Sequence, residues 1–181
     1  MSNQNTGVDQ GNGPNPGSTL VRRAEVEPWH DQQWQRLWLA IESRPWRSLA
    51  LIPGSEGAPL DFTLTIAVNL SRTGMVHLGS AIQVADGTRV PLNQLTPFLN
   101  EVRRCTSMGD RLLVALPPNG TSPIATTIAQ SLDAAVLCVM LEQMASVDAK
   151  RTIKAVGASR FLGSVIVHPS QTIARPHGPP K

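Results

Sequence analysis

Short apolar runs alternate with amphipathic segments through the middle of the chain. Runs of strand type occupy residues 48–52, 75–85, 110–116, 134–141 and 161–168. Segments of helical type, with apolar residues three and four positions apart, occupy residues 25–44, 58–73, 92–104, 122–131 and 146–156. Strands joined through helices pair in parallel, because each helix returns the chain to the same end of the sheet. The pattern predicts an α/β fold, with a doubly wound, mostly parallel sheet of about five strands and helices on both faces.

Both ends of the chain differ in composition from this alternating part. Residues 1–24 are rich in Asn, Gly, Pro and Gln, and residues 169–181 are rich in Pro. Such segments carry too little apolar surface to offset the entropy lost when a chain becomes ordered. We therefore expect a disordered leader, a single domain over residues 25–168 and a flexible tail.

Charge and composition exclude several classes of function. The formal net charge is only +3 and the basic residues are scattered, which disfavours nucleic acid as a partner. The chain has no apolar run of about 18 residues and no secretion signal, so the expected location is the cytoplasm, with at most a peripheral membrane contact. Cys105 and Cys138 lack a paired motif and are expected as free thiols, while the four scattered histidines predict no metal site.

The turn after the first strand is the candidate ligand site, because the N–H groups and dipole of a following helix attract anions. It consists of Pro53, Gly54, Ser55, Glu56 and Gly57. A phosphate loop of the P-loop type continues with a lysine and a hydroxyl residue, but this chain continues with Ala58 and Pro59. Two interpretations stay open. One is a capped helix after a glycine turn, and the other is a backbone nest that accepts an anion without lysine.

The tryptophans are concentrated in one short part of the chain. Trp29, Trp34, Trp38 and Trp46 are all four in the sequence. One interpretation is a helix packed over the sheet with the rings as anchors. The other is an aromatic docking face for a partner, with Trp29, Trp34 and Trp38 as candidates, since tryptophan is enriched at interface hot spots.

A second candidate surface for a partner is basic. Lys150, Arg151 and Lys154 fall on one expected helix. Such a cluster is typical of a solvated helix face. Alternatively, it contacts anionic lipid headgroups or an acidic loop of a membrane protein.

Several segments, in this order, resemble a known family. They are LALIPGSEG, TIAVNLSRTG, VADGTRVP, DRLLVALPPN with SPIATTIAQSLDAAVLCVM, and VGASRFLGSVIV. The chain resembles the ATPase-like domain of bacterial tyrosine kinases that act in capsule and exopolysaccharide synthesis, which are relatives of the MinD/ParA-type P-loop proteins. The resemblance implies a P-loop NTPase-like fold over most of the domain.

The same resemblance implies a disabled nucleotide site. Ala58 stands where the family has its phosphate-binding lysine, and Pro59 stands where it has the hydroxyl that holds magnesium. The two acidic positions of the second motif fall on Ala85 and Gly87, and the Walker B aspartate falls on Ala115. The chain also has no tyrosine, whereas the family's kinases carry a C-terminal tyrosine cluster.

These observations lead to an expected function with two alternatives. The first expectation is a non-catalytic cytoplasmic component of polysaccharide synthesis or export, without cofactor, that binds a membrane co-polymerase or a related kinase and is open to homo-oligomer formation. One alternative is a tyrosine-kinase-like enzyme that binds ATP with magnesium through an atypical loop or with residues supplied by a partner. The other is a MinD/ParA-like positioning factor.

Overall fold

Five parallel strands form one sheet in the computed structural model of the chain, which describes residues 27–141 and 146–168. The strands are β1 (Ser48–Pro53), β2 (Ile82–Asp86), β3 (Arg111–Ala115), β4 (Ala134–Met140) and β5 (Phe161–Val167). Their order across the sheet is β2-β3-β1-β4-β5, and every neighbouring pair is parallel. The α/β fold and the parallel sheet expected from the sequence are confirmed. The expected leader and tail lie outside the described residues.

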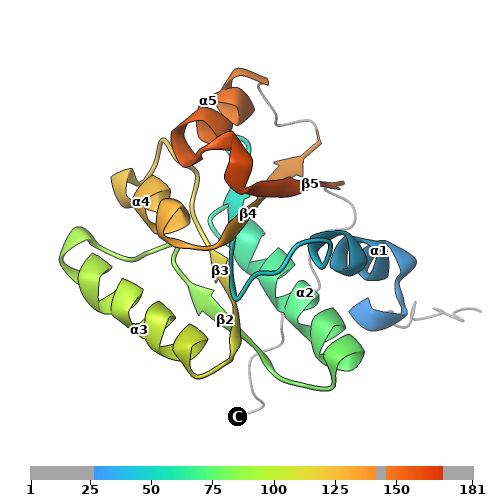
Figure 1. Cartoon of the computed structure of the whole chain (residues 1–181). Helices are drawn as coiled ribbons and strands as arrows, with labels where there is room; N and C mark the ends of the chain where they lie inside the picture. Colours follow the sequence, from blue (N-terminus) through green and yellow to red (C-terminus); the bar gives the residue numbers. More distant parts are fainter. Residues whose placement is uncertain (1–26, 142–145, 169–181) are drawn as a thin grey trace, which may run out of the picture.

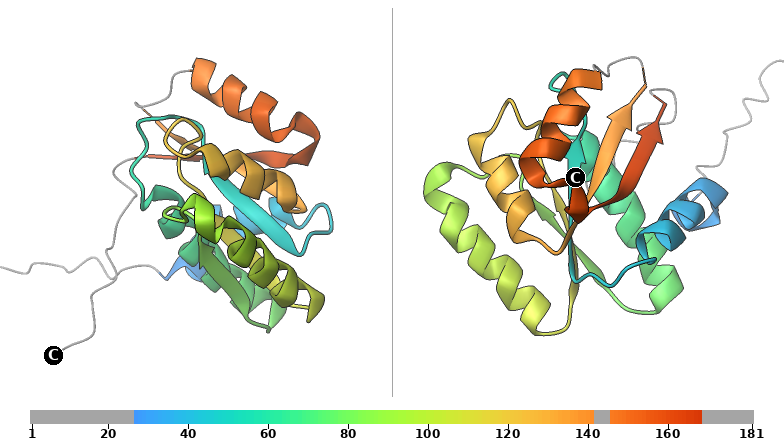
Figure 2. Two further views of the ribbon diagram at one scale, coloured as in Figure 1. Left: turned by 90° about the vertical axis from the view of Figure 1, so that its left-hand side faces the viewer. Right: turned by 45° about the horizontal axis from the view of Figure 1, so that its top comes forward.

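Helices cover both faces of this sheet (Figures 1 and 2). They are α1 (Gln32–Ile41), α2 (Phe62–Leu78), α3 (Leu95–Ser107), α4 (Pro123–Ser131) and α5 (Ser146–Val156), with short 3-10 turns η1 (Pro28–His30), η2 (Leu92–Gln94) and η3 (Ala158–Arg160). The β1-to-β2 connection runs in the opposite direction across the sheet from the later ones. Right-handed crossovers therefore place α2, beside α1, on one face, and α3, α4 and α5 on the other.

Alternate residues of the central strands supply the two hydrophobic cores. In β1, Leu49 and Leu51 face the core under α1 and α2, while Ala50 and Ile52 face the core under α3, α4 and α5. All four are 0 % exposed. A strand buried on both faces reads as an unbroken apolar run, and this is why β1 was recognisable in the sequence.

The first strand is held at its start by one carboxylate. Asp133 Oδ2 accepts hydrogen bonds from the backbone N–H groups of Arg47 (2.9 Å) and Ser48 (2.8 Å), and from the Ser48 hydroxyl (3.0 Å). Burial raises the pKa of Asp133, but these hydrogen bonds outweigh it, so that the pKa lies below its ordinary value. The carboxylate thus joins the start of β1 to the residue that precedes β4.

The second helix corrects one expectation from the sequence. We expected it to end before Gly74 and a strand to cover residues 75–85, but α2 continues through Leu78 and β2 begins only at Ile82. Gly74 is buried inside the helix, where a Cβ atom would lie 2.5 Å from the Trp38 ring. The helix ends at Gly79, whose φ of 66° is the left-handed conformation typical of a helix C-terminus. Gly74 is therefore a packing residue and Gly79 is the terminator.

The expected first helix, residues 25–44, is also shorter than predicted. The described part begins with η1, and Asp31 separates this turn from α1 because its backbone is extended. The Asp31 carboxylate accepts a hydrogen bond from the Gln33 N–H at 2.7 Å and so caps α1.

Candidate functional site

Three connections lie at the carboxyl ends of the strands, and the first of them contains the candidate turn expected from the sequence. Residues 54–61 join β1 to α2, residues 87–91 join β2 to η2, and residues 116–122 join β3 to α4. Strand β1 lies between β3 and β4, and the connections from β1 and β4 leave in opposite directions across the sheet. This is the position at which open α/β sheets hold ligands.

The turn that follows β1 is tied to the strand beside it. Gly54 N–H donates to the Cys138 carbonyl at 2.8 Å, and a Cβ atom on Gly54 would lie 3.4 Å from the Val139 side chain. Pro53, Gly54 and Ser55 are buried. Gly57 N–H donates to the Ser55 hydroxyl at 3.3 Å, so this amide is already engaged within the turn.

The two positions after the turn do not carry phosphate-binding side chains. Ala58 is only 8 % exposed and packs in the core under α1 and α2, while Pro59 is exposed. Helix α2 begins only at Phe62, where the Phe62 N–H donates to the Pro59 carbonyl at 3.1 Å. A capped helix was one interpretation of this stretch, but the Asp61 side chain makes no cap hydrogen bond. The start of the helix is therefore displaced from the glycine turn.

Acidic and main-chain groups occupy the space between this turn and the β3–α4 connection. The Glu56 carboxylate lies against Gly120, because a Cβ atom there would approach its Cδ atom to 2.5 Å. The Thr63 hydroxyl donates to the Leu116 carbonyl at 2.8 Å and joins α2 to the end of β3. A negative charge at this point opposes the approach of a phosphate group.

The remaining motif positions also lack metal-binding groups. Ala85 is partly buried, Ala115 is 0 % exposed, and Gly87 lies so close to β3 that a Cβ atom would sit 2.9 Å from the Ala115 carbonyl. Asp86 is exposed and its carboxylate accepts hydrogen bonds from the Thr88 N–H (2.9 Å) and hydroxyl (2.6 Å). The described residues contain no group of three His, Cys, Asp or Glu side chains placed to hold a metal ion.

Basic side chains are scarce around this edge. The β1–α2 and β3–α4 connections contain no lysine or arginine, and the β2–η2 connection contains only Arg89. The residues present therefore do not fit Mg·ATP, which requires cations and metal ligands around its phosphates. The three described connections lie at the same edge of the sheet and carry Arg89 as their one basic side chain.

A cavity of about 340 Å³ lies away from this edge, between α1 and the C-terminal half of α2. Its lining residues are Trp29, Gln35, Trp38, Leu39, Thr73, Val76 and His77. Trp38 is 1 % exposed, and its Nε1 has no hydrogen-bond partner among the described residues. Of these residues, the sequence pattern predicted only Trp29 and Trp38 as candidates for a docking face. Leu39 (57 % exposed) and Val76 (61 % exposed) are apolar residues that lie outside the buried faces of their helices. Apolar residues at such positions are the sequence signal that could have indicated this cavity.

The tryptophans divide between core and surface. Trp38 and Trp46 are buried and meet edge to face, with ring centroids 6.1 Å apart. The Trp46 Nε1 donates to the Ile41 carbonyl at 3.0 Å, and the Arg111 guanidinium lies 5.0 Å from its ring centroid. Trp29 and Trp34 are half-buried. Trp29 and Trp34 therefore stay partly accessible, whereas the buried Trp38 acts as an anchor for α1.

The basic candidate residues lie where the sequence placed them, on one helix. Lys150, Arg151 and Lys154 are all exposed on α5. The Arg151 guanidinium lies 3.9 Å from the Asp148 carboxylate, which is a weak contact at this exposure. None of the helices among the described residues has the length and apolarity needed to cross a membrane.

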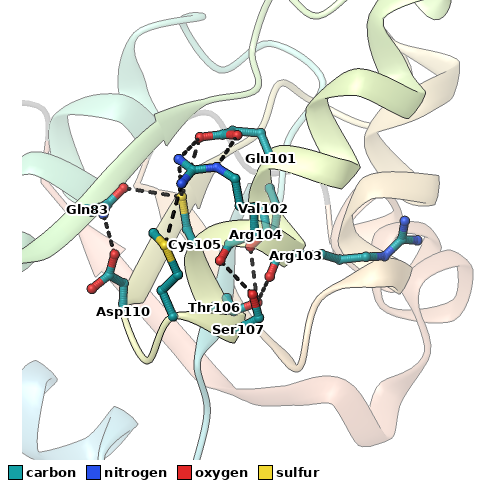
Figure 3. A network of polar contacts seen from close by, with 10 residues as sticks. Gln83, Glu101, Val102, Arg103, Arg104, Cys105, Thr106, Ser107 and Asp110 are labelled. Atoms are coloured by element: carbon teal, nitrogen blue, oxygen red, sulfur yellow. Dashed lines mark hydrogen bonds and ion pairs between the residues drawn. The ribbon is translucent and has the colours of Figure 1, made fainter.

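A polar network at the other end of the sheet has a structural role (Figure 3). Cys105 Sγ lies 3.5 Å from Gln83 Oε1, and Gln83 Nε2 donates to Asp110 Oδ2 at 2.7 Å. The Arg104 guanidinium pairs with Glu101 at 2.5 Å, and this hydrogen bond lowers the pKa of Glu101. Burial raises the pKa of the Cys105 thiol, so this network joins α3 to β2 without activating a nucleophile.

Comparisons with known proteins support the fold and go no further. No family model matches the sequence, and no curated protein matches it. A solved structure, "Crystal structure of the chimerical protein CapA2B2", superposes with a TM-score of 0.59 at 14 % sequence identity. The match covers 81 % of this chain and 87 % of that chain. This chain is therefore similar in fold to the chimerical protein CapA2B2.

Proposed function

We propose that this protein is a non-catalytic component of bacterial capsule or exopolysaccharide synthesis or export, which acts by binding a membrane co-polymerase or a related kinase. The resemblance of its sequence segments to the capsule-related kinase domains and its likeness in fold to CapA2B2 support the pathway. The loss of phosphate-binding chemistry supports the non-catalytic role. On this proposal, the sheet and helices are kept because they present binding surfaces.

The observation that carries the non-catalytic role is the position of Ala58. A phosphate-binding residue must project from the turn toward solvent, but this side chain is 8 % exposed and packs in the hydrophobic core. A lysine at this position would have to bury its aliphatic stem and its charged ammonium group in that core, which is energetically costly. Catalysis of phosphoryl transfer depends almost entirely on positioning and electrostatic stabilisation. The described β1–α2 and β3–α4 connections contain no lysine or arginine that could supply it.

Isothermal titration of the full chain with Mg·ATP tests this part of the proposal. We expect no heat of binding at nucleotide concentrations up to about 1 mM, which corresponds to a binding free energy weaker than about −4 kcal/mol. Phosphate release should equal that of buffer alone, with and without the kinase partner. A micromolar dissociation constant, or turnover stimulated by the partner, would support the enzymatic alternative instead.

Binding to a partner is tested with the basic face of α5. The cytoplasmic segments of a membrane polysaccharide co-polymerase encoded beside this gene are titrated with the protein. Alanine at Lys150, Arg151 and Lys154 together should weaken binding and reduce its dependence on salt, because exposed ion pairs are screened by salt. A control protein with alanine at three exposed arginines elsewhere, Arg72, Arg89 and Arg103, should bind as the wild type does. Equal losses in both variants would exclude a specific role for α5.

A further inference from the structure

Strand β5 forms an edge of the sheet and pairs on one side only among the described residues (Figure 2). Leu141 N–H donates to the Val167 carbonyl at 3.0 Å, so the main-chain groups of Val167 point toward β4. Successive residues of a strand alternate in direction, and Val165 therefore points the same way. The main-chain groups of Ser164 and Ile166 point away from the sheet, and within the described residues they have no acceptor or donor.

The open part of this edge lacks the features that usually protect edge strands. Residues 161–167 contain no charged residue and no proline, and Ile166 is 58 % exposed. Charged side chains, prolines and bulges are the usual means of preventing an edge from pairing with another chain. At its start β5 is guarded, because Arg44 Nη2 donates to the Phe161 carbonyl at 2.8 Å and the pairing with β4 shifts register there. Residues 163–167 are left unguarded.

The opposite edge of the sheet is different. Strand β2 has five residues, ends at the charged Asp86, and its Gln83 is bonded to Asp110. Pairing of this edge with β5 of another molecule would place a carboxylate in the ladder, and such a heterologous contact would also leave open ends. Among the strands of this chain, the most suitable partner for residues 163–167 is therefore the same segment of a second molecule.

We propose that residues 163–167 pair antiparallel with the same residues of a second copy, about a two-fold axis at Val165, to form a continuous ten-stranded sheet in a dimer. In this register the outward groups of Ser164 face those of the partner's Ile166, and the reverse, which makes about four hydrogen bonds. No like charges meet across the axis, because the strand has none. The edge is already extended, so little ordering entropy opposes the pairing.

The test measures the mass of the full chain by sedimentation over protein concentrations from about 1 µM to about 1 mM, the range in which small interfaces assemble. We expect a reversible monomer–dimer equilibrium. Ile166→Pro removes an outward N–H that β4 does not use, and proline is tolerated at such edge positions. This variant should be monomeric with an unchanged circular dichroism spectrum. Ile166→Val keeps the N–H and serves as the matched control, which should still dimerise.

A cross-link tests the register independently. Residues at the two-fold axis form a non-hydrogen-bonded pair with Cα atoms about 4.5 Å apart, a distance that a disulfide spans. Val165→Cys should therefore give an oxidised dimer, while Ile166→Cys should not, because its thiol faces the partner's Ser164. The native thiols, at 4 % and 1 % exposure, do not compete.

Three outcomes would overturn the proposal. They are a wild-type chain that stays monomeric at all concentrations, a dimer that persists in a folded Ile166→Pro variant, and a Val165→Cys variant that does not cross-link. If Ile166→Pro fails to fold, the Val165→Cys result decides. None of these results depends on whether the protein binds nucleotide.

Discussion

Replacing Gly74 by alanine sets two physical effects against each other inside α2. In a helix, glycine to alanine normally stabilises by about 1 kcal/mol, because alanine loses less backbone entropy on folding. Here the added Cβ atom would lie 2.5 Å from two carbons of the buried Trp38 ring and would also overlap the Ile82 side chain. Normal carbon contacts are about 3.5–4.0 Å, so a rigid indole would have to move by about 1 Å or more.

Overpacking of this kind costs about 1–3 kcal/mol, and the rigidity of the indole places Gly74→Ala at the upper end. After subtraction of the helix-propensity gain, we expect the free energy of unfolding to fall by about 2 kcal/mol. For a domain of this size, that lowers the melting temperature by roughly 4–8 °C. Urea unfolding followed by circular dichroism measures the first quantity, and calorimetry measures the second.

A matched control separates steric overlap from backbone strain. Gly79→Ala also destabilises, because Gly79 has a φ of 66°, but a Cβ atom there would meet nothing within 4 Å. Trp38→Phe makes room next to position 74. In a double-mutant cycle, its coupling energy with Gly74→Ala should therefore be about 1 kcal/mol or more in favour of the double variant, whereas its coupling energy with Gly79→Ala should be close to zero. A Gly74→Ala variant that is more stable than the wild type would refute the reasoning. So would equal coupling at both glycines.

Three further predictions follow from contacts that the structure shows. Asp133→Asn should lower the free energy of unfolding at neutral pH. Because the folded-state pKa of Asp133 is lowered, the carboxylate's stabilising effect is complete above the ordinary pKa of about 4 and disappears as the pH falls through the folded-state pKa. The free energies of unfolding of the two proteins, measured by urea titration from pH 7 to about pH 2, should therefore converge at low pH. Thr63→Val should lower the free energy of unfolding by about 1–2 kcal/mol, since it leaves a buried carbonyl at the end of β3 without its donor. Thr65→Val removes a more exposed hydrogen bond and should lower the free energy of unfolding by less. A greater loss of stability in Thr65→Val would contradict the structural role of the Thr63 hydrogen bond. Burial raises the pKa values of Cys105 and Cys138. Neither thiol should therefore react with a thiol reagent at pH 8 until urea unfolds the protein. Rapid labelling of the folded chain would contradict this prediction, because it would show that at least one thiol is accessible.

Much of the architecture was present in the local pattern of the sequence. The runs that became β1, β3 and β4 were recognisable because a parallel strand covered on both faces must be apolar throughout its length. The run that became β5 was also recognisable as apolar, although this edge strand is partly exposed. Short connections between strands and helices then allowed a doubly wound sheet and little else. The candidate turn at Pro53 could be located for the same reason, since it directly follows the most buried strand.

Tertiary structure decided the order of the strands, the length of α2 and the presence of unpaired main-chain groups along β5. Local sequence could not show that Gly74 lies within a helix, because the reason is the Trp38 ring on a different helix. Likewise, only the folded sheet shows that Glu56 lies against Gly120 and that Ser164 and Ile166 point away from β4. The alternation of apolar and polar residues records which positions are buried. Which residues meet across the core or remain open at an edge depends on contacts between segments distant in sequence.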